Sequence, residues 1–314
     1  MLNFYSIDTI KNCNIKYIDV YFSNDYGVAC NYSDNAIWEL CQYKDLIYVY
    51  LKKEYEYSGK IYYDLISPYG YSGYYYKDLQ TFKEFIPLFR IEAKKKNYLT
   101  EVVKQSPFMN IKLDLYYKEI VTKKLFSTEI TNYKDYYMNS LKSKTRNIIN
   151  KSNRDGLEYE IKDFTHDDIK QFVEMYKNSM DKVGAEKYYY FNKSYFQQMT
   201  KLCKIIKIFK NGKVIGQSIF MFYNNFIHYH LSCSDYSSNL ITTFLLNTII
   251  RTYGPGKKII LGCGLKDNDS LYKFKSKIST NSYDYTIYKN IINKDVYDRI
   301  NHDNDSKYFP KHRS

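Results

Sequence analysis

The sequence lacks the features that mark a membrane or secreted protein. It has no uninterrupted run of about 18 apolar residues, the length that a membrane-spanning helix needs. Residues 1–22 contain no basic segment followed by an apolar one, so no signal peptide is expected. We therefore expect no transmembrane segment and a cytoplasmic protein, with the inner face of the membrane as one place where it could work.

Paired cysteines are also absent. None of the six cysteines stands in a CxxC pair, and zinc-type spacing is missing, so no metal is expected (Cys13, Cys30, Cys41, Cys203, Cys233 and Cys263). We expect reduced cysteines packed as small apolar residues. Cys263 lies between two glycines and could instead lie near a ligand. As a nucleophile it would need a paired base, and the sequence does not show one.

Arginine is scarce for so basic a chain. The net charge is +13, which favours an anionic partner such as nucleic acid, a phosphorylated substrate or a membrane surface. Only six of the 47 basic residues are arginine, however, and arginine is the side chain that holds phosphate with two parallel hydrogen bonds. The charge therefore permits an anionic partner without identifying one.

The first half of the chain mixes strand and helix patterns. Apolar residues at helical spacing predict a helix in DLQTFKEFIPLFRIEAKKKN, and the SPYGYSG segment before it breaks regular structure. Ala36–Tyr43 fits either a short helix or a strand. Strands are predicted at Lys16–Phe22, at Asp45–Lys53, in KIYYDLI and in LTEVVKQ.

The second half has a distinct order of elements. Residues 132–155 read as one helix that ends before Gly156, followed by a strand and a helix capped by His166 or Asp167. Next come a short helix in KSYFQQMTKLC and a three-stranded meander with Asn-Gly and Asn-Asn turns. A helix, a strand ending in LGCG and a last helix, SLYKFKSKI, complete the order. We place the domain boundary near residues 128–138.

Four segments, in this order, resemble FemABX-like proteins of the GNAT superfamily. They are DVYFSNDY (19–26), DLISPYGYSG (64–73), SKTRNIINKSNRDGLEYEI (143–161), and the closing pattern HYHLSCS…LGCG…DSLYKFKSKIS. Cys263 stands where the usual closing pattern has glycine, and Ile278-Ser279 where it has Phe-Ser. Neither departure removes a charged or nucleophilic group.

The resemblance implies an α+β fold with two tandem GNAT-like domains, each a mixed, mostly antiparallel sheet flanked by helices. The expected domains are residues 1–131 and 132–300, followed by a polar tail at 301–314. The implied activity is transfer of an acyl or aminoacyl group to an amine of a cell-envelope or polysaccharide precursor, by direct attack and without a covalent enzyme intermediate. The donor would be an aminoacyl-tRNA, an acyl-CoA or an acyl-carrier thioester, with no permanently bound cofactor.

Two histidines are candidates for the base that such a transfer needs. Strict alternation in HYHLSCSD places His228, His230 and Ser232 on one strand face. A histidine beside the acyl slot could take the proton of the attacking amine. Alternatively, both are packed or surface histidines without a chemical role.

Lys275 is the third candidate catalytic residue. The resemblance places it where FemABX-like enzymes commonly have a lysine, whose ammonium could stabilise the oxyanion or the leaving group. The alternative is an exposed helix lysine. Lys273 and Lys277 should point elsewhere on the helix.

The remaining candidates are binding residues. Arg146 and Lys151 match family positions and could bind phosphate of a nucleotide sugar or tRNA, or form a solvated basic helix face. Asp269 or Ser270 should cap the last helix, and Tyr69 and Tyr71 should shape a domain interface. The expected substrate-binding set is Arg146, Lys151, Tyr69, Tyr71, Ser232 and Asp269.

Partners follow from the same resemblance. We expect a nucleotide- or lipid-linked sugar or peptide precursor, tRNA as a candidate, and peripheral membrane contact. The segment SDYSSNLITTF lacks the glycine-rich pyrophosphate loop of CoA-dependent GNAT enzymes, which disfavours CoA. The alternative function is a non-catalytic GNAT-like module that binds an anionic ligand such as RNA.

Overall fold

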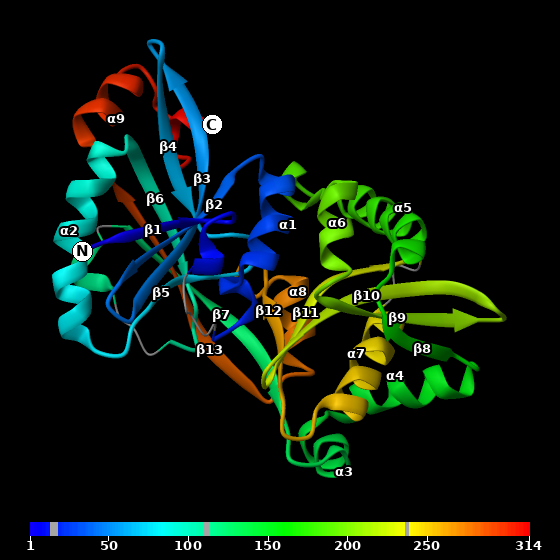
Figure 1. Cartoon of the computed structure of the whole chain (residues 1–314). Helices are drawn as coiled ribbons and strands as arrows, with labels where there is room; N and C mark the ends of the chain where they lie inside the picture. The colour runs from blue at the N-terminus through cyan, green and yellow to red at the C-terminus, as the bar shows by residue number, and fades with distance from the viewer. Residues whose placement is uncertain (13–17, 110–112, 118, 236–238) are drawn as a thin grey trace. The chain divides into compact units, whose positions relative to one another are not determined.

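The computed structural model describes residues 1–12, 18–109, 113–117, 119–235 and 239–314. The chain forms two compact units (Figure 1). Unit 1 comprises residues 1–17, 21–122 and 285–314, and unit 2 comprises residues 18–20 and 123–284. The expected division at 131/132 and 300 was drawn on sequence alone and stays a prediction.

The sheet of unit 1 follows the order β1-β2-β3-β4-β6-β13, with β5 beside β3. All its pairs are antiparallel except β4 with β6. Its strands are β1 (Asn3–Ser6), β2 (Ile37–Tyr43), β3 (Leu46–Tyr57), β4 (Lys60–Ile66), β5 (Gly73–Tyr75), β6 (Tyr98–Gln105) and β13 (Asn281–Ile291).

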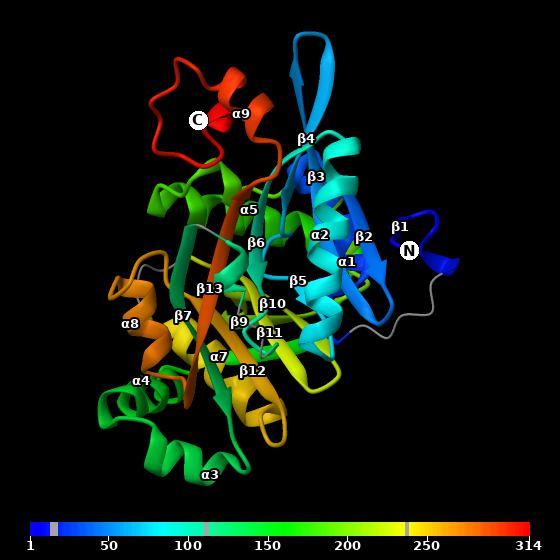
Figure 2. The same cartoon turned by 90° about the vertical axis from the view of Figure 1, so that its left-hand side faces the viewer.

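Helix α2 (Leu79–Lys95) connects the parallel strands β4 and β6 and covers one face of this sheet (Figure 2). Its inner face buries Phe82, Phe85 and Phe89 in an aromatic core with tyrosines of β3 and β5. The other helices are α1 (Asn24–Asp34), α9 (Lys294–Ile300) and the short turns η1 (Ile10–Asn12), η2 (Val20–Phe22), η3 (Asp114–Tyr116) and η6 (Lys311–Arg313).

Unit 2 repeats this plan. Its sheet order is β8-β9-β10-β11-β12-β7, and all pairs are antiparallel except β11 with β12, which α7 connects. In both units one helix therefore crosses between the one parallel pair described. The strands are β7 (Glu119–Glu129), β8 (Glu158–Asp163), β9 (Cys203–Lys210), β10 (Lys213–Tyr223), β11 (Phe226–Ser234) and β12 (Lys258–Cys263).

Helices cover both faces of the unit 2 sheet, with α5 and α6 on one side and α4 and α7 on the other (Figure 1). The apolar core on the α7 side includes Phe220, Leu246 and Ile259. The helices are α3 (Tyr133–Asp135), η4 (Tyr136–Ser140), α4 (Ser143–Arg154), α5 (His166–Val183), η5 (Lys187–Tyr189), α6 (Lys193–Met199), α7 (Asn239–Tyr253) and α8 (Ser270–Ser276).

One strand of each sheet comes from an unexpected part of the chain. β7 pairs with β12 of unit 2 through Leu125–Glu129, and β13, which follows α8, pairs with β6 of unit 1 through Thr286–Ile291. β7 follows β6 of unit 1 along the chain but joins the sheet of unit 2, whereas β13 follows β12 and α8 of unit 2 but joins the sheet of unit 1. The sequence analysis did not predict β13.

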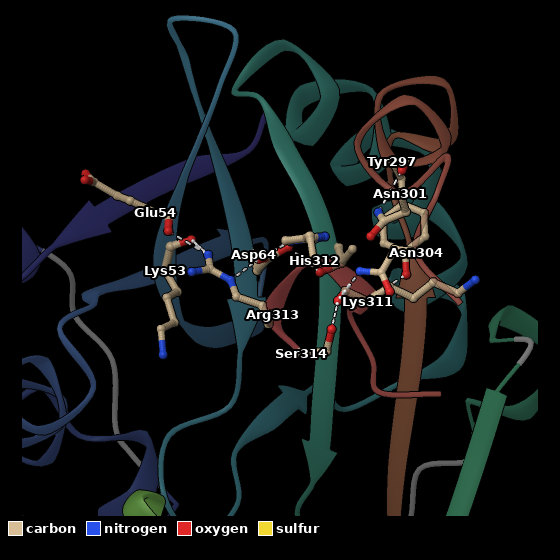
Figure 3. Close-up of polar contacts among 11 residues, drawn as sticks. Lys53, Glu54, Asp64, Tyr297, Asn301, Asn304, Lys311, His312, Arg313 and Ser314 are labelled. Carbon is tan, nitrogen blue, oxygen red and sulfur yellow. Dashed lines mark hydrogen bonds and ion pairs between the residues drawn. The ribbon is translucent and has the colours of Figure 1, made fainter. Parts of the chain in front are cut away.

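Residues 301–314, expected as a polar tail, pack on unit 1. His312 Nε2 and Arg313 Nε each lie 2.8 Å from Asp64 Oδ2 on β4, and the Arg313 fork also donates to the carbonyls of Lys53 and Glu54 (Figure 3). Thr100 Oγ1 donates to the other Asp64 oxygen at 2.6 Å. Burial opposes ionisation, but His312, Thr100 and Arg313 hold the pKa of Asp64 below its ordinary value.

The predicted fold class is confirmed, and most predicted elements are present, but three local predictions are wrong. Val20–Phe22 is a short helical turn instead of a strand, while Lys16 and Tyr17 lie outside the described residues. Thr165, one residue earlier than expected, caps α5 through a capping box with Asp168. The single helix predicted at 132–155 is divided, because Leu141 and Lys142 are extended and α4 begins only at Ser143.

Candidate functional site

The candidate site begins where two parallel strands of unit 2 stop pairing. β11 and β12 pair at three positions, the last of which is His228 with Ile260. β11 then continues to Ser234 alongside β10, and β12 continues to Cys263 alongside β7. Both strands thus extend beyond the end of the parallel ladder. The three candidate catalytic residues belong to β11 or to α8, the helix after β12.

Lys275 is buried, not an exposed helix lysine. Its side chain projects from α8, which Asp269 caps as predicted, and Lys275 Nζ donates to the main-chain carbonyl oxygen of Cys263 at 2.7 Å. Burial lowers the pKa of Lys275 to about 8, although Cys263 and Asp269 partly oppose that shift. No ion pair among the described residues includes Lys275, so its ammonium keeps donor capacity for an anion.

The loop between β12 and α8 is built around this ammonium. Gly262 has a φ of +79°, and a Cβ placed on it would lie 3.2 Å from Lys275 Nζ. Asp269 accepts hydrogen bonds from the main-chain N–H groups of Leu265, Lys266 and Tyr272. Burial opposes ionisation of Asp269, but these N–H groups hold its pKa below the ordinary value. Asp269 therefore holds the conformation of the loop through hydrogen bonds to its main chain.

The neighbouring cysteine is not an activated thiol. Burial raises the pKa of Cys263 to about 11, although Lys275 and Lys123 act in the other direction. Lys123 Nζ also donates to the carbonyl of Leu265 at 2.9 Å, which adds a second ammonium to this loop. Burial likewise raises the pKa of Cys203 and of Cys233. These thiols stay protonated at neutral pH and are poor nucleophiles.

Both histidines of β11 are buried and have named partners. His228 Nε2 lies 2.7 Å from Asp19 Oδ1, and both side chains are almost fully buried. His230 Nε2 shares a hydrogen bond with Tyr195 Oη of α6. Burial, with the nearby His228, lowers the pKa of His230 to about 3, so His230 is neutral at physiological pH and is a weak base. His228 is the better placed of the two for proton transfer.

A bulge changes the expected alternation of β11. The register passes from Leu231 opposite Ile219 to Tyr229 opposite Phe220, so β11 has one extra residue, His230, at this point of the ladder. As a result His230 and Leu231 are both buried, and strict period-two alternation does not hold through this strand. Ser232 is half-buried and its hydroxyl donates to the carbonyl of Gln217.

The other predicted binding residues lie elsewhere. Arg146 Nη1 donates to the carbonyls of Met138 and Leu141, so much of its fork is used within the chain at the start of α4, while Lys151 is exposed on the same helix. In unit 1, Tyr71 is buried against the ring of Tyr21, and the Tyr69 carbonyl accepts from Tyr26. Binding roles for these residues stay predictions.

The sequence analysis missed Asp19, Tyr195, Gly262 and Lys123. Asp19 opens one of the four resembling segments, which was the only signal pointing to it. The segment expected to replace the pyrophosphate loop includes residues 236–238, which lie outside the described residues.

Comparisons with known proteins agree on the fold. No protein-family model matches the chain. No curated protein matches it either. The structure is similar to a crystal structure of FemX, with a TM-score of 0.70 and 11% identity over 90% of this chain and 94% of that one.

Two further structures are similar over most of their length. One is a C-terminal domain assigned to a lysylphosphatidylglycerol synthetase of Agrobacterium fabrum, with a TM-score of 0.64 and 11% identity over 91% of each chain. The other is L-PGS of Bacillus licheniformis, with a TM-score of 0.55 and 13% identity over 85% of this chain and 86% of that one. The chain therefore shares the fold of FemX over most of its length, with two units that repeat one plan.

Proposed function

We propose that the protein is an acyl- or aminoacyltransferase that moves an acyl group from an activated ester or thioester to an amine. The buried Lys275 ammonium carries this proposal. It lies on the carbonyl of Cys263 near the end of the parallel ladder, and no ion pair among the described residues includes it. Folding a charged lysine into such a place is costly, and an anion that forms there during reaction would offset the cost.

In the proposed reaction the acceptor amine attacks the donor carbonyl directly. A carbon–nitrogen bond forms while the carbonyl electrons move to oxygen, and the ammonium of Lys275 stabilises this oxyanion. When the tetrahedral intermediate collapses, the carbon–oxygen or carbon–sulfur bond breaks. With a pKa of about 8, Lys275 can also donate a proton to the leaving hydroxyl or thiol.

The attacking nitrogen must also lose a proton. We assign this proton to His228, directly or through water, because Asp19 orients its ring and stabilises the imidazolium that would form. The raised pKa values of the buried cysteines fit a route without a covalent enzyme intermediate.

We also propose the chemical class of the donor and of the acceptor. An aminoacyl-tRNA or an acyl thioester is the donor, and an amine of a nucleotide- or lipid-linked envelope precursor is the acceptor. Two structures similar to this chain are a lysylphosphatidylglycerol synthetase domain and L-PGS, which supports including lipid-borne acceptors in the search. The similarity to FemX, together with the resemblance to FemABX-like proteins, supports a cell-envelope precursor as the acceptor.

The test is a transfer assay with purified protein, using radiolabelled aminoacyl-tRNA pools and acyl-CoA donors with amine acceptors. Lys275→Ala should reduce transfer at least a hundredfold, the loss typical of removing one oxyanion donor. Lys277→Ala, an exposed lysine just past the same helix, should leave transfer unchanged. No transfer from any donor, or equal behaviour of the two variants, would contradict the proposal.

One observation favours the alternative function, a module that binds RNA. Helix α4 contains no acidic residue and exposes Lys144, Lys151 and Arg154. Such a surface would bind RNA with an affinity that falls steeply as salt rises. Tight RNA binding that persists in Lys275→Ala and His228→Ala, in a protein without transferase activity, would favour this function.

A further inference from the structure

The outward face of helix α2 is apolar where a solvent-facing helix is normally polar. Leu88 is 42% exposed and Ile91 is 55% exposed, and the outward-facing Pro87 stands beside them. Ile91 is a surface neighbour of both Pro87 and Leu88, because it lies four residues after the first and three after the second. The inner face already buries Phe82 and Phe89, so this apolar strip is additional to the strip that forms the core.

A further exposed apolar side chain lies on an element that contacts α2. Leu115 is 95% exposed and belongs to η3, which packs on the flank of α2. Arg90 Nη2 of α2 donates to the carbonyl of Tyr116 at 2.7 Å, and the Tyr116 ring meets Phe82 at 5.1 Å. These contacts fix the turn that carries Leu115 beside the helix. Single exposed leucines are ordinary, but a group on adjoining elements marks a binding surface.

Lysines lie at both ends of the strip. Lys83 is exposed one turn before Pro87, and Lys94 and Lys95 are exposed in the last turn of α2. Neither Lys83 nor Lys94 takes part in an ion pair among the described residues, whereas the acidic neighbours are compensated: Glu84 pairs with Lys44, and Glu92 pairs with Lys95. The strip is thus apolar in its middle and positively charged at its ends.

We propose that this face of unit 1, formed by α2 and η3, binds the surface of an anionic lipid bilayer. An amphipathic helix lies in the headgroup region when apolar side chains enter the acyl boundary and lysines meet anionic headgroups. The long lysine stems let the ammonium groups reach the headgroups while their methylenes stay with the apolar strip. Charge complementarity therefore favours a bilayer over a protein partner. The proposal stands independently of the chemistry assigned to Lys275.

The experiment is co-sedimentation of the full chain with vesicles of phosphatidylcholine alone or with 30–40% phosphatidylglycerol, on the order of the anionic content that attracts basic segments. The chain should bind the anionic vesicles, and Leu88→Glu/Ile91→Glu should reduce the bound fraction at least tenfold. Lys83→Gln/Lys94→Gln should weaken binding to anionic vesicles and remove its salt dependence. Circular dichroism and melting temperature confirm that the variants fold.

Val183→Glu is the matched control, because Val183 is 71% exposed at the end of α5 in unit 2. It should bind vesicles as the unchanged chain does. No binding to anionic vesicles, equal binding by Leu88→Glu/Ile91→Glu, or equal loss in Val183→Glu would overturn the proposal. So would a dimer that the same double substitution dissociates, since the strip would then be a protein interface. Transfer to a soluble amine should be unaffected, which separates this result from failure of the proposed function.

Discussion

The ammonium of Lys275 lies 2.7 Å from the carbonyl oxygen of Cys263, and the α-carbon of Gly262 faces that ammonium without a side chain. A main-chain carbonyl oxygen thus accepts a hydrogen bond from a buried ammonium that forms no ion pair among the described residues. An ion without an opposite charge in an apolar setting lowers stability, so the presence of a buried lysine here indicates a role in binding or chemistry.

The transfer rate should depend on pH through Lys275. Because the ammonium is the active form and its pKa is about 8, the rate should fall about tenfold per pH unit well above pH 8. A pH profile of kcat/KM with a donor stable at alkaline pH measures this limb. The residual activity of Lys275→Ala should lack it; a limb that persists in that variant would assign the titration to another group.

Replacing Lys275 by methionine should stabilise the protein near neutral pH. The pKa falls from 10.5 in the unfolded chain to about 8, so the charged lysine costs up to about 3 kcal/mol, of which the lost hydrogen bond to Cys263 offsets about 1. The unfolded chain binds more protons between pH 8 and 10.5, so the native protein gains stability as pH rises there, and the advantage of Lys275→Met should shrink. Urea denaturation at pH 7 and pH 10 checks both statements.

Exposed Lys277 provides the comparison, since Lys277→Met should change the free energy of unfolding little. If Lys275→Met proved less stable than the unchanged protein at pH 7, the lysine would be a structural element and not a strained functional one.

Gly262→Ala should impair transfer by displacing Lys275. The new methyl group would lie 3.2 Å from Nζ, and the φ of +79° adds strain of about 1 kcal/mol. Gly256→Ala imposes similar strain, at a φ of +73°, with no atom within 4 Å of the methyl group. We expect both variants to lose similar stability, but only Gly262→Ala to lose about tenfold or more in kcat. Equal kcat values would mean that Gly262 does not position the lysine.

The Asp19–His228 pair should stabilise unit 2 by joining two residues that are 209 positions apart in the sequence. Both side chains are buried, and a hydrogen bond to a charged group typically contributes about 1.5–3 kcal/mol to stability. Asp19→Ala should therefore lower the free energy of unfolding by that order, and a double-mutant cycle with His228→Ala should give a coupling of about 1–3 kcal/mol. The exposed pair His302–Asp303 is the control, and Asp303→Ala should have little effect. A coupling near zero would contradict a native pair.

Asp64 should anchor the last residues of the chain. Asp64→Asn removes the charge shared by His312 and Arg313, and we expect a loss of about 3 kcal/mol in urea denaturation, together with faster carboxypeptidase digestion. The pKa of Asp64 is lowered in the folded state, so its contribution is present above its unfolded pKa and is lost as pH falls. Asp298→Asn, which affects an exposed pair with Lys294, should change neither measurement.

The local predictions succeeded where a segment is governed by its own residues. Helix α5 forms where it was predicted, and Asn211 and Gly212 take the positive φ angles that their turn requires. Asp269 caps α8 because a cap depends on residues three positions apart. The FemABX-like fold could be predicted because four ordered segments resembled that family.

The failures have an equally physical cause. The helix predicted at 132–155 is interrupted at Leu141, whose side chain is buried in the unit 2 core and whose carbonyl accepts from Arg146. Tertiary packing outweighs helix propensity there, because a buried leucine stabilises more than one further helical residue does. The bulge at His230 likewise depends on the pairing of β11 with β10, which alternation in one strand cannot reveal.

The sequence by itself determined most elements of each unit, because periodicity and capping are local properties, and the resemblance of four ordered segments indicated the class of fold and the candidacy of Lys275. Only the tertiary structure decided that Lys275 is buried on the carbonyl of Cys263, that Asp19 meets His228, and that His312 reaches Asp64. These contacts join residues 12, 209 and 248 positions apart. Such partners are selected by the packing of whole strands, and the burial that shifts the pKa of Lys275 exists only after that packing.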